Sequence, residues 1–509
     1  MRSIFLLAAI AALSLLAGCG PPKVSGNTVT VLIESSPANL DPRVGTDAQS
    51  ERIDALLFDS LVRRDRTFGI APELATSWQT PDPLTYVFHL RTNVHFADGR
   101  PLTARDVKWS LDTLVNGAIP TVKSAAYKSF QSVDTPNPQT VVVHLGKPDT
   151  GLLLNVCDGA FGVIPYGSGR DFWRHPVGSG PFTYVSQEQD KNVLLRRNPL
   201  YWGGPPSVQN VSFDVVPDAI TRALELQKGS ADIAVNALPN DALATLARNP
   251  HLRVQSAPGT SLVYLVFNLR DPYLRDTRVR DAIGAAVNRK LIIRTLIDGR
   301  AREADSILPP EHWAYTNDVQ QHPFDPSAAN TLLDAAGYRR GPDGIRFHLV
   351  LKSSTDETRR LICAVLQSQL AQVGIALDIR SYEFATFYAD MTKGAFAMAL
   401  SNWIGGNEAP DIFGYAYSST RTPPHGANRG FYSNPRVDAL VADAAANPFR
   451  AMQIRDYQAI QLQLAYDLPV LNLWYMDTVA VENNRLTPLA LQPSGNFDFL
   501  RTVRVLSPD

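Results

Sequence analysis

The spacing of apolar residues along the chain switches repeatedly between two periods, which predicts alternating strands and helices. Short runs rich in β-branched and aromatic residues are typical of strands. Residues 261–269 form an almost continuous apolar run, the pattern of a strand buried on both faces. The other predicted strands are 29–33, 84–91, 193–196, 211–215, 232–235, 376–379, 396–400 and 470–475.

Between these runs, apolar residues recur at helical spacing. Thr103 and Asp106 have the spacing of a capping box at the start of a helix, and Val107, Leu111 and Leu114 follow on one face. Single helices are predicted at 219–228, 278–297, 357–372, 385–392 and 451–466, with another beginning at Pro435. In the 357–372 segment we expect an inward face of Leu361, Val365, Leu366, Leu370 and Val373. This alternation predicts an α/β protein with mostly parallel sheets.

The N-terminus has the pattern of an export signal. Arg2 precedes an apolar run over residues 4–16, which falls short of the roughly 20 residues that span a bilayer. The run ends in Leu-Ala-Gly-Cys, which resembles a bacterial lipobox. We therefore expect a signal peptide at 1–18, lipid attachment at Cys19 and a lipidated tether at 19–27. The alternative is a plain secretory signal with a chance cysteine.

Length and charge narrow the class of protein. The chain has 509 residues, which is longer than a single hydrophobic core usually supports, so at least two lobes are expected. The formal net charge is −1, which leaves no basic surplus to neutralise phosphates, and nucleic acid is not an expected partner. The local cluster Arg63, Arg64, Asp65 and Arg66 is most simply interpreted as solvated surface.

Motifs for catalysis are lacking. The sequence has no nucleophile elbow, zinc-binding helix pair, Walker loop or dinucleotide fingerprint. Residues 178–181 are interpreted as a tight turn, and His89 and His95 as surface residues, because no further ligand lies at metal-binding spacing. Cys157 and Cys363 are expected to be separate buried thiols. We predict no catalytic residue, no metal and no cofactor.

Six segments together resemble one known family. They are residues 37–42, 57–62, 71–111 (including DPLTYVFHLRTNVHFADGRPLTARDVKWSL), 176–204, 266–293 and 366–413. In sequence and in order they are similar to the oligopeptide/dipeptide/nickel-binding family of ABC-transporter solute-binding proteins, also called extracellular solute-binding protein family 5. The resemblance covers nearly all of the chain after the signal.

That resemblance implies the type II periplasmic-binding-protein fold in its large three-domain form, with two lobes joined by a two-strand hinge. Domain I would comprise 28–65, 175–266 and 476–509. Domain II would be the insertion 66–174, and domain III would span 267–475. The two crossings between lobes are expected near 263–268 and 471–475.

The resemblance also implies a function. The protein would enclose a small solute, a short peptide or peptide-like compound, and deliver it to an ABC permease in the cytoplasmic membrane. It would act as a monomer, without a cofactor, in the periplasm or at the cell surface on its lipid anchor. Two alternatives stay open: a surface lipoprotein with hydrolase activity, and a sensory receptor of the same fold.

The expected ligand site follows from the family's cleft loops. The candidates are Gln49, Ser50, Asn268, Asn402, Trp403, Gly405, Gly406 and Glu408. Trp403 offers a flat apolar wall, although an aromatic residue there could equally belong to the core. In peptide-binding members, an aspartate three residues after this tryptophan grips the ligand's α-amino group, and here that position is Gly406. Either Glu408 supplies the missing charge, or the solute is neutral or differently charged.

Overall fold

The computed structural model describes residues 27–157, 159, 161–447 and 449–506. The predicted signal peptide, Cys19 and all but the last residue of the tether lie outside these ranges. Within them, no helix has both the length and the apolar character needed to cross a membrane.

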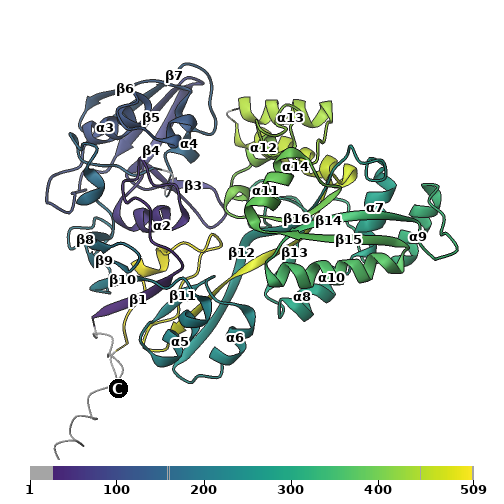
Figure 1. Cartoon of the computed structure of the whole chain (residues 1–509). Coiled ribbons are helices and arrows are strands. Elements are labelled where there is room, and N and C mark those ends of the chain that lie inside the picture. The colour runs from purple at the N-terminus through teal and green to yellow at the C-terminus, as the bar shows by residue number, and fades with distance from the viewer. Residues whose placement is uncertain (1–26, 158, 160, 448, 507–509) are drawn as a thin grey trace, which may run out of the picture.

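One mixed sheet of eleven strands runs through the molecule (Figure 1), in the order β15-β14-β16-β12-β17-β11-β1-β10-β9-β8 with β13 paired to β17. Its strands are β1 (Thr28–Ile33), β8 (Phe182–Glu188), β9 (Asn192–Arg197), β10 (Asn210–Val215), β11 (Ile233–Val235), β12 (Leu252–Phe267), β13 (Ala301–Glu303), β14 (Phe347–Ser354), β15 (Ile375–Tyr382), β16 (Met398–Trp403) and β17 (Val470–Asn483). Two smaller antiparallel sheets consist of β2 (Val62–Arg64) with β3 (Ile70–Pro72), and of β4 (Ala75–Asp82), β5 (Thr85–Leu90), β7 (Thr140–Leu145) and β6 (Phe130–Asn137).

The expectation of mostly parallel sheets was wrong. Only the pairs β1–β10, β1–β11, β14–β15 and β14–β16 are parallel. The long strands β12 and β17 run in opposite directions, and each pairs antiparallel with its other neighbour in the sheet. These parallel pairs fall into two groups, β11, β1 and β10 in one part of the sheet and β15, β14 and β16 in another.

Several helices have the predicted bounds because strong local signals fix their ends. The helices are α2 (Ala48–Leu57), α3 (Ala104–Val115), α4 (Leu152–Asn155), α5 (Ala219–Lys228), α6 (Asn240–Leu246), α7 (Thr277–Ala286), α8 (Arg289–Leu296), α9 (Pro326–Ala335), α10 (Glu357–Gln372), α11 (Phe384–Lys393), α12 (Ile412–Tyr417), α13 (Pro435–Ala446) and α14 (Arg450–Asp467). In α3, the Asp106 carboxylate accepts from the Thr103 backbone N–H at 2.8 Å, which confirms the capping box. Gly229 ends α5 in the left-handed conformation, with φ 75°.

The helix predicted at 278–297 is two helices. Val287 is extended (φ −94°, ψ 112°) and ends α7, and the Asn288 side chain then accepts from the backbone N–H of Leu291 to begin α8. The apolar period continues across this break, so it could not reveal it. In α10, Leu361 is 47% exposed, whereas Ile362 and Cys363 are buried, so the expected inward face was wrong at Leu361.

The chain forms two bodies joined by β12 and β17. The first body consists of the described residues of 27–257 and 478–506, and the second body of residues 261–476. In Figure 1 the two long strands run between the body at the left and the body at the right. One end of β17 pairs with β11 in the first body, and one end of β12 pairs with β16 in the second.

Hydrophobic cores separate along the same lines. One core draws its buried residues from 61–163, and two more from the remainder of the first body. Two further cores draw only on residues 262–475. Cys157 and Cys363 are both fully buried, in different cores, as predicted. The crossings were expected near 263–268 and 471–475, but most of these residues belong to cores of the second body. The passage between the bodies therefore occurs nearer residues 257–261 and 476–478.

Candidate ligand-binding cleft

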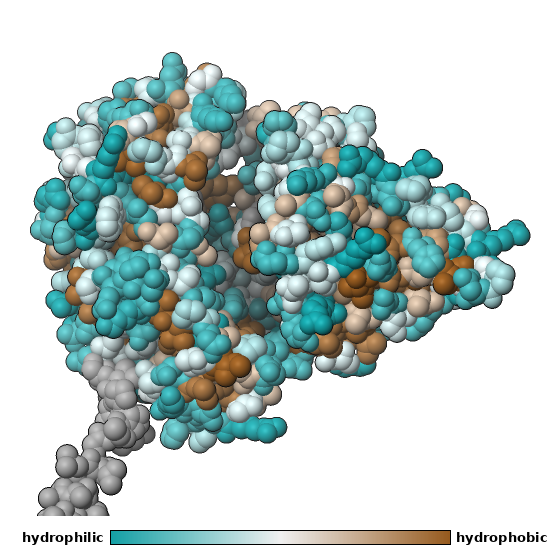
Figure 2. Space-filling model, in the orientation of Figure 1, coloured by the Kyte–Doolittle hydropathy of each residue, from teal (hydrophilic) through white to brown (hydrophobic). Residues whose placement is uncertain are grey.

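A cavity of about 840 Å³ lies between the two bodies. Figure 2 shows the hollow from its open side. Its volume falls within the roughly 300–1,000 Å³ of small-molecule sites. Two other cavities, both within the second body, hold about 20 and 30 Å³, which is room for water. Size therefore selects the cavity between the bodies as the candidate site.

Four segments form the walls of this cavity. The first body contributes the start of α2, the β2–β3 hairpin and the C-terminal segment from Ala490 to Thr502, and the second body contributes the loop after β16. The parallel strands β14 and β16 end at this side of the second body, and ligands of α/β proteins characteristically bind at the carboxyl ends of such strands. The lining thus comes from both bodies.

The floor of the cavity lies close to the strands that join the bodies. Between the pairs Ala257–Thr478 and Ser261–Met476, β12 advances four residues while β17 advances two. Gly259 lies in this bulge, and a Cβ there would be 2.3 Å from the Met476 carbonyl oxygen. The bulge breaks the regular ladder at the one place where both strands pass between bodies.

The loop after β16 turns sharply into the cavity. Gly405 has φ 71°, a left-handed conformation that glycine adopts without steric cost, and the short 3₁₀ turn Gly406–Glu408 follows. Ile404 and Gly405 line the cavity, and Ile404 is 73% exposed. An apolar side chain so exposed on a cavity wall is available for contact with a ligand.

Glu408 is committed to other protein groups. Its carboxylate accepts hydrogen bonds from the Thr260 hydroxyl at 2.8 Å and from the Arg64 guanidinium at 2.7 Å. Glu408 as a whole is 5% exposed. Thr260 lies in the bulge of β12, and Arg64 ends β2 in the first body. Glu408 therefore ties the second body to the first across the cavity floor, and its charge is matched by Arg64.

Other contacts between the bodies lie beside this ion pair. The Trp313 backbone N–H donates to the Thr67 carbonyl at 3.1 Å, and the His312 ring stacks on Phe68 with centroids 5.8 Å apart. Burial, together with the cations Arg450 and Arg64, lowers the pKa of His312 to about 3. The ring is therefore neutral at physiological pH, and its Nδ1 accepts from the Ala314 N–H at 3.0 Å.

Charged side chains dominate the wall contributed by the first body. Arg52 on α2 and Arg63, Arg64 and Arg66 on the β2–β3 hairpin line the cavity, as does Arg501 in the C-terminal segment. The hairpin cluster is thus part of a cavity wall: Arg63, Asp65 and Arg66 are exposed, as expected of solvated surface, whereas Arg64 is half-buried. Burial is the main cause of a lowered pKa at Arg52 and of a raised pKa at Glu51 beside it.

The predicted site residues divide into two groups. Gly405 and Glu408 line the cavity, and Gly406 lies between them. Asn402 accepts from Arg359 at 2.6 Å. Trp403 packs beside Tyr264 and Arg429, next to the lining but not in it. The loop after Trp403 therefore lines the cavity through Ile404, Gly405 and Glu408.

The remaining candidates are held inside the fold. Gln49 is buried and donates to Glu34 at 2.7 Å, although its neighbours Ala48 and Glu51 line the cavity. Ser50 is fully buried and accepts from the Asn39 backbone N–H. Asn268 donates to the carbonyls of Gly394 and Phe396, away from the cavity. The polar groups of Ser50 and Asn268 thus serve the fold.

Two further sequence features also have structural roles. The segment 178–181 packs against the end of α2, where a Cβ on Gly178 would lie 1.8 Å from the Leu57 carbonyl oxygen. Ser179 donates to the buried Asp59 at 2.8 Å. Among the residues with described positions, no three His, Cys, Asp or Glu side chains are grouped to hold a metal ion.

Comparison with known proteins settles the family. The model for "bacterial extracellular solute-binding proteins, family 5 Middle" matches residues 69–423. The chain belongs to this family. The dipeptide-binding protein of Escherichia coli K12 is 25% identical to it over 96% of each chain. A glutathione-binding protein, GsiB, from Salmonella choleraesuis is 28% identical over 94% of each.

Solved structures agree on the fold of this family 5 solute-binding protein. The substrate-binding protein CtaP of Listeria monocytogenes superposes with a TM-score of 0.84 at 22% identity, covering 94% of this chain and 99% of that one. The type II binding-protein fold with two lobes, expected from the resemblance, is confirmed. By name, these two relatives are binding proteins for a dipeptide and for glutathione.

Proposed function

We propose that this chain is the substrate-binding component of an ABC importer. It encloses a small solute, a short peptide or peptide-like compound, between its two bodies and delivers it to a permease in the cytoplasmic membrane. The observation that carries the proposal is the cavity of about 840 Å³ lined by both bodies, between which the chain passes along β12 and β17. Family membership supports the same function.

The mechanism follows from this geometry. A solute that touches both walls binds the closed arrangement better than an open one, so binding shifts the population toward closure. Closure about a few residues is a common response of two-lobed binding proteins to their ligands. The bulge at Gly259 and the opposite segment of β17 are the proposed hinge. The permease would then recognise the closed shape.

The anchor and the domain division belong to this proposal. Cys19 would carry acyl chains that hold the protein in the periplasm or at the cell surface, and the supporting observation is the apolar run that ends in the lipobox-like tetrapeptide. Domain I would comprise 28–65, 175–266 and 476–509, domain II 66–174 and domain III 267–475. The separate hydrophobic cores of 61–163, the rest of the first body and 262–475 support this division, except that Leu61, Val62 and the buried residues of 262–266 fall on the other side of its boundaries.

The proposed ligand contacts are revised by the side-chain positions. Gln49, Asn402, Trp403, Gly405, Gly406 and Glu408 remain in the proposed site, because each lines the cavity or adjoins its lining. Ser50 and Asn268 are left out, because their polar atoms are already bonded within the fold. Ile404 and the arginines of the first body are added.

Protein purified from the cells that produce it is expected to retain its solute. Native mass spectrometry should show an added mass in the range of a small molecule, which disappears after unfolding, dialysis and refolding. The emptied protein should melt at a lower temperature, because a ligand at about 100 times its dissociation constant adds about 2.7 kcal/mol of stability. A protein that carries no small molecule, and that no extract of the same cells stabilises, would contradict the proposed function.

A further inference from the structure

We propose that the solute is a net anion, and that Arg52, Arg63 and Arg66 of the first body bind its carboxylate or phosphate group. This inference rests on the proposed function and specifies its ligand. It comes from comparing the acidic and basic side chains that line the cavity between the bodies, and from asking which of them already have an ion-pair partner.

Most acidic groups on the cavity wall already have partners. Glu408 pairs with Arg64, and Asp498 with Arg501. Asp65 accepts from the backbone N–H groups of Thr67 and Gly69 in its own turn. Glu73 is 2% exposed and accepts from the Ser60 backbone N–H at 3.0 Å. Glu73 also lies 3.9 Å from Arg501, which leaves Glu51 and Asp65 as the acids of the described lining without an ion-pair partner.

The basic groups are not matched in the same way. Arg64 and Arg501 are used in the pairs above. Arg63 donates through Nε to the Pro72 carbonyl, and Arg52 lies 5.7 Å from the centre of the Phe497 ring. Across the part of the chain with described positions, no carboxylate forms an ion pair with Arg52, Arg63 or Arg66. Among the described lining residues, three arginines without an ion-pair partner therefore face the cavity together with two carboxylates without one, Glu51 and Asp65.

Guanidinium chemistry determines which group fits. Arginine presents planar paired donors that match the two oxygens of a carboxylate or phosphate. Burial already lowers the pKa of Arg52, so an anion beside it would offset the cost of keeping its charge out of water. Ile404, exposed on the opposite wall, would contact an apolar part of the same solute.

The same balance disfavours a ligand held by its ammonium group. Gly406 has no side chain, and the Glu408 carboxylate is neutralised by Arg64. Neither loop residue offers a free negative charge. The recognition charge in this cleft is therefore positive and lies on the first body.

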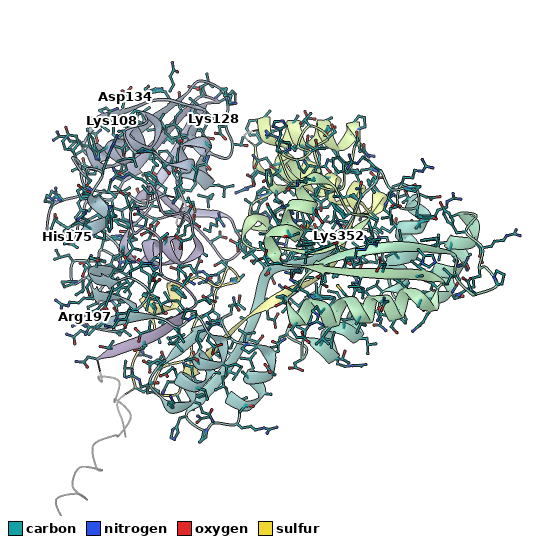
Figure 3. The ribbon with its side chains drawn as sticks, viewed as in Figure 1. Lys108, Lys128, Asp134, His175, Arg197 and Lys352 are labelled. Carbon is teal, nitrogen blue, oxygen red and sulfur yellow. The ribbon has the colours of Figure 1, made fainter. Side chains whose placement is uncertain are left out.

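The test uses the ligand-free protein and a small-molecule extract of the cells that produce it. Anion-exchange resin at neutral pH divides the extract into a retained, anionic fraction and an unretained fraction of neutral, zwitterionic and cationic compounds. Each fraction is titrated against the melting temperature of the wild type and of Arg52→Gln, Arg63→Gln and Arg66→Gln. Arg197→Gln is the matched control, because Arg197 is exposed on the outer face of the first body (Figure 3) and no side-chain interaction is seen for it in the described structure.

The retained fraction alone is expected to raise the melting temperature. Arg52→Gln should need at least about tenfold more extract for the same shift, since a charged hydrogen bond is lost. Arg197→Gln should behave as the wild type. Variant melting temperatures without extract show that each variant is folded.

Stabilisation by the unretained fraction alone would overturn the anionic ligand and leave the proposed function standing. Unchanged titrations in all three cleft variants would do the same. If neither fraction stabilises the wild type, the proposed function itself fails, and this inference with it.

Discussion

Replacing Arg43 with methionine is expected to lower the free energy of unfolding by about 3–5 kcal/mol, the usual cost of leaving a buried charge unpaired. Arg43 and Asp41 are each 1% exposed and form a two-pronged ion pair, with Nη2 and Oδ2 2.6 Å apart and Nε and Oδ1 2.9 Å apart. Methionine has a similar volume but no charge, so the Asp41 carboxylate would lose its partner inside the protein.

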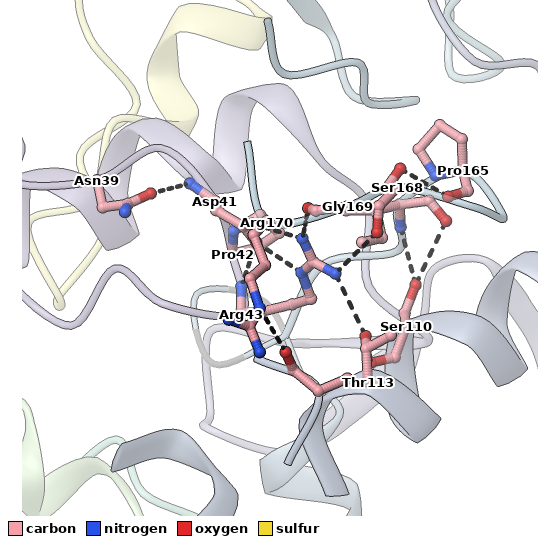
Figure 4. A network of polar contacts seen from close by, with 12 residues as sticks. Asn39, Asp41, Pro42, Arg43, Ser110, Thr113, Pro165, Ser168, Gly169 and Arg170 are labelled. Carbon is pink, nitrogen blue, oxygen red and sulfur yellow. Dashed lines mark hydrogen bonds and ion pairs between the residues drawn. The ribbon is translucent and has the colours of Figure 1, made fainter. Parts of the chain in front are cut away.

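Arg43 also joins three separate segments of the first body (Figure 4). Its guanidinium donates to the carbonyls of Ser168 and Gly169 at 3.3 and 2.9 Å, and to the Thr113 hydroxyl on α3 at 3.4 Å. The segment that carries Arg43 leads directly into α2, whose first turns line the cavity. Loss of these bonds would therefore disturb the cavity wall as well as stability.

Urea denaturation of the wild type and Arg43→Met measures this effect through the change in midpoint at constant slope. Arg197→Met is the control, since it removes an exposed arginine and should change stability by less than about 0.5 kcal/mol. If Arg43→Met lowers the free energy of unfolding by less than about 1 kcal/mol, the ion pair between Arg43 and Asp41 contributes little to stability beyond the packing of the Arg43 side chain.

Replacing Gly259 with alanine is expected to weaken both stability and solute binding. The added Cβ would lie 2.3 Å from the Met476 carbonyl oxygen and 2.8 Å from the Thr478 backbone nitrogen, and backbone atoms in a paired strand cannot move aside cheaply. Overpacking of this kind costs about 1–3 kcal/mol. The strain falls where β12 and β17 pass between the bodies, so the closed state should become less stable relative to the open one. Each 1.4 kcal/mol lost from the closed state weakens binding about tenfold.

Titration of the anionic extract fraction against Gly259→Ala and the wild type measures this loss of affinity. Gly146→Ala is the matched control, because a Cβ at Gly146 meets its nearest neighbour at 3.9 Å and the residue is exposed. Wild-type affinity in Gly259→Ala, with lowered stability, would place the hinge elsewhere.

The elements of the fold that local signals determine could be predicted from sequence. The capping box at Thr103 and the glycine after α5 fix helix ends within the chain segment itself. The break between α7 and α8 could not be predicted, because apolar residues continue through it and only a local change at Val287 ends the helix. Strand direction was also missed, since the antiparallel pairing of β12 with β17 joins segments more than 200 residues apart.

The candidate site could be predicted only where a family motif marks it. The loop at Trp403 was found in this way, and it forms one wall. Arg52, Arg63, Arg66 and Arg501 lack any common spacing, so their meeting on the opposite wall depends on how α2, the β2–β3 hairpin and the C-terminal segment pack. The role of Glu408 was missed for the same reason, because its partner Arg64 is 344 residues away in sequence.

Closure of the two bodies on a solute is tested most directly by the distance between them. Spin labels at Lys128→Cys in the first body (Figure 3) and at Ala442→Cys on α13 of the second body (Figure 1) lie at exposed positions on the two bodies. Pulsed electron resonance should show a broad distribution that includes long distances in the emptied protein, and a single shorter distance once the stabilising extract fraction is added. Identical distributions under both conditions, at a concentration that raises the melting temperature, would contradict the account, because the solute would then bind without closing the bodies.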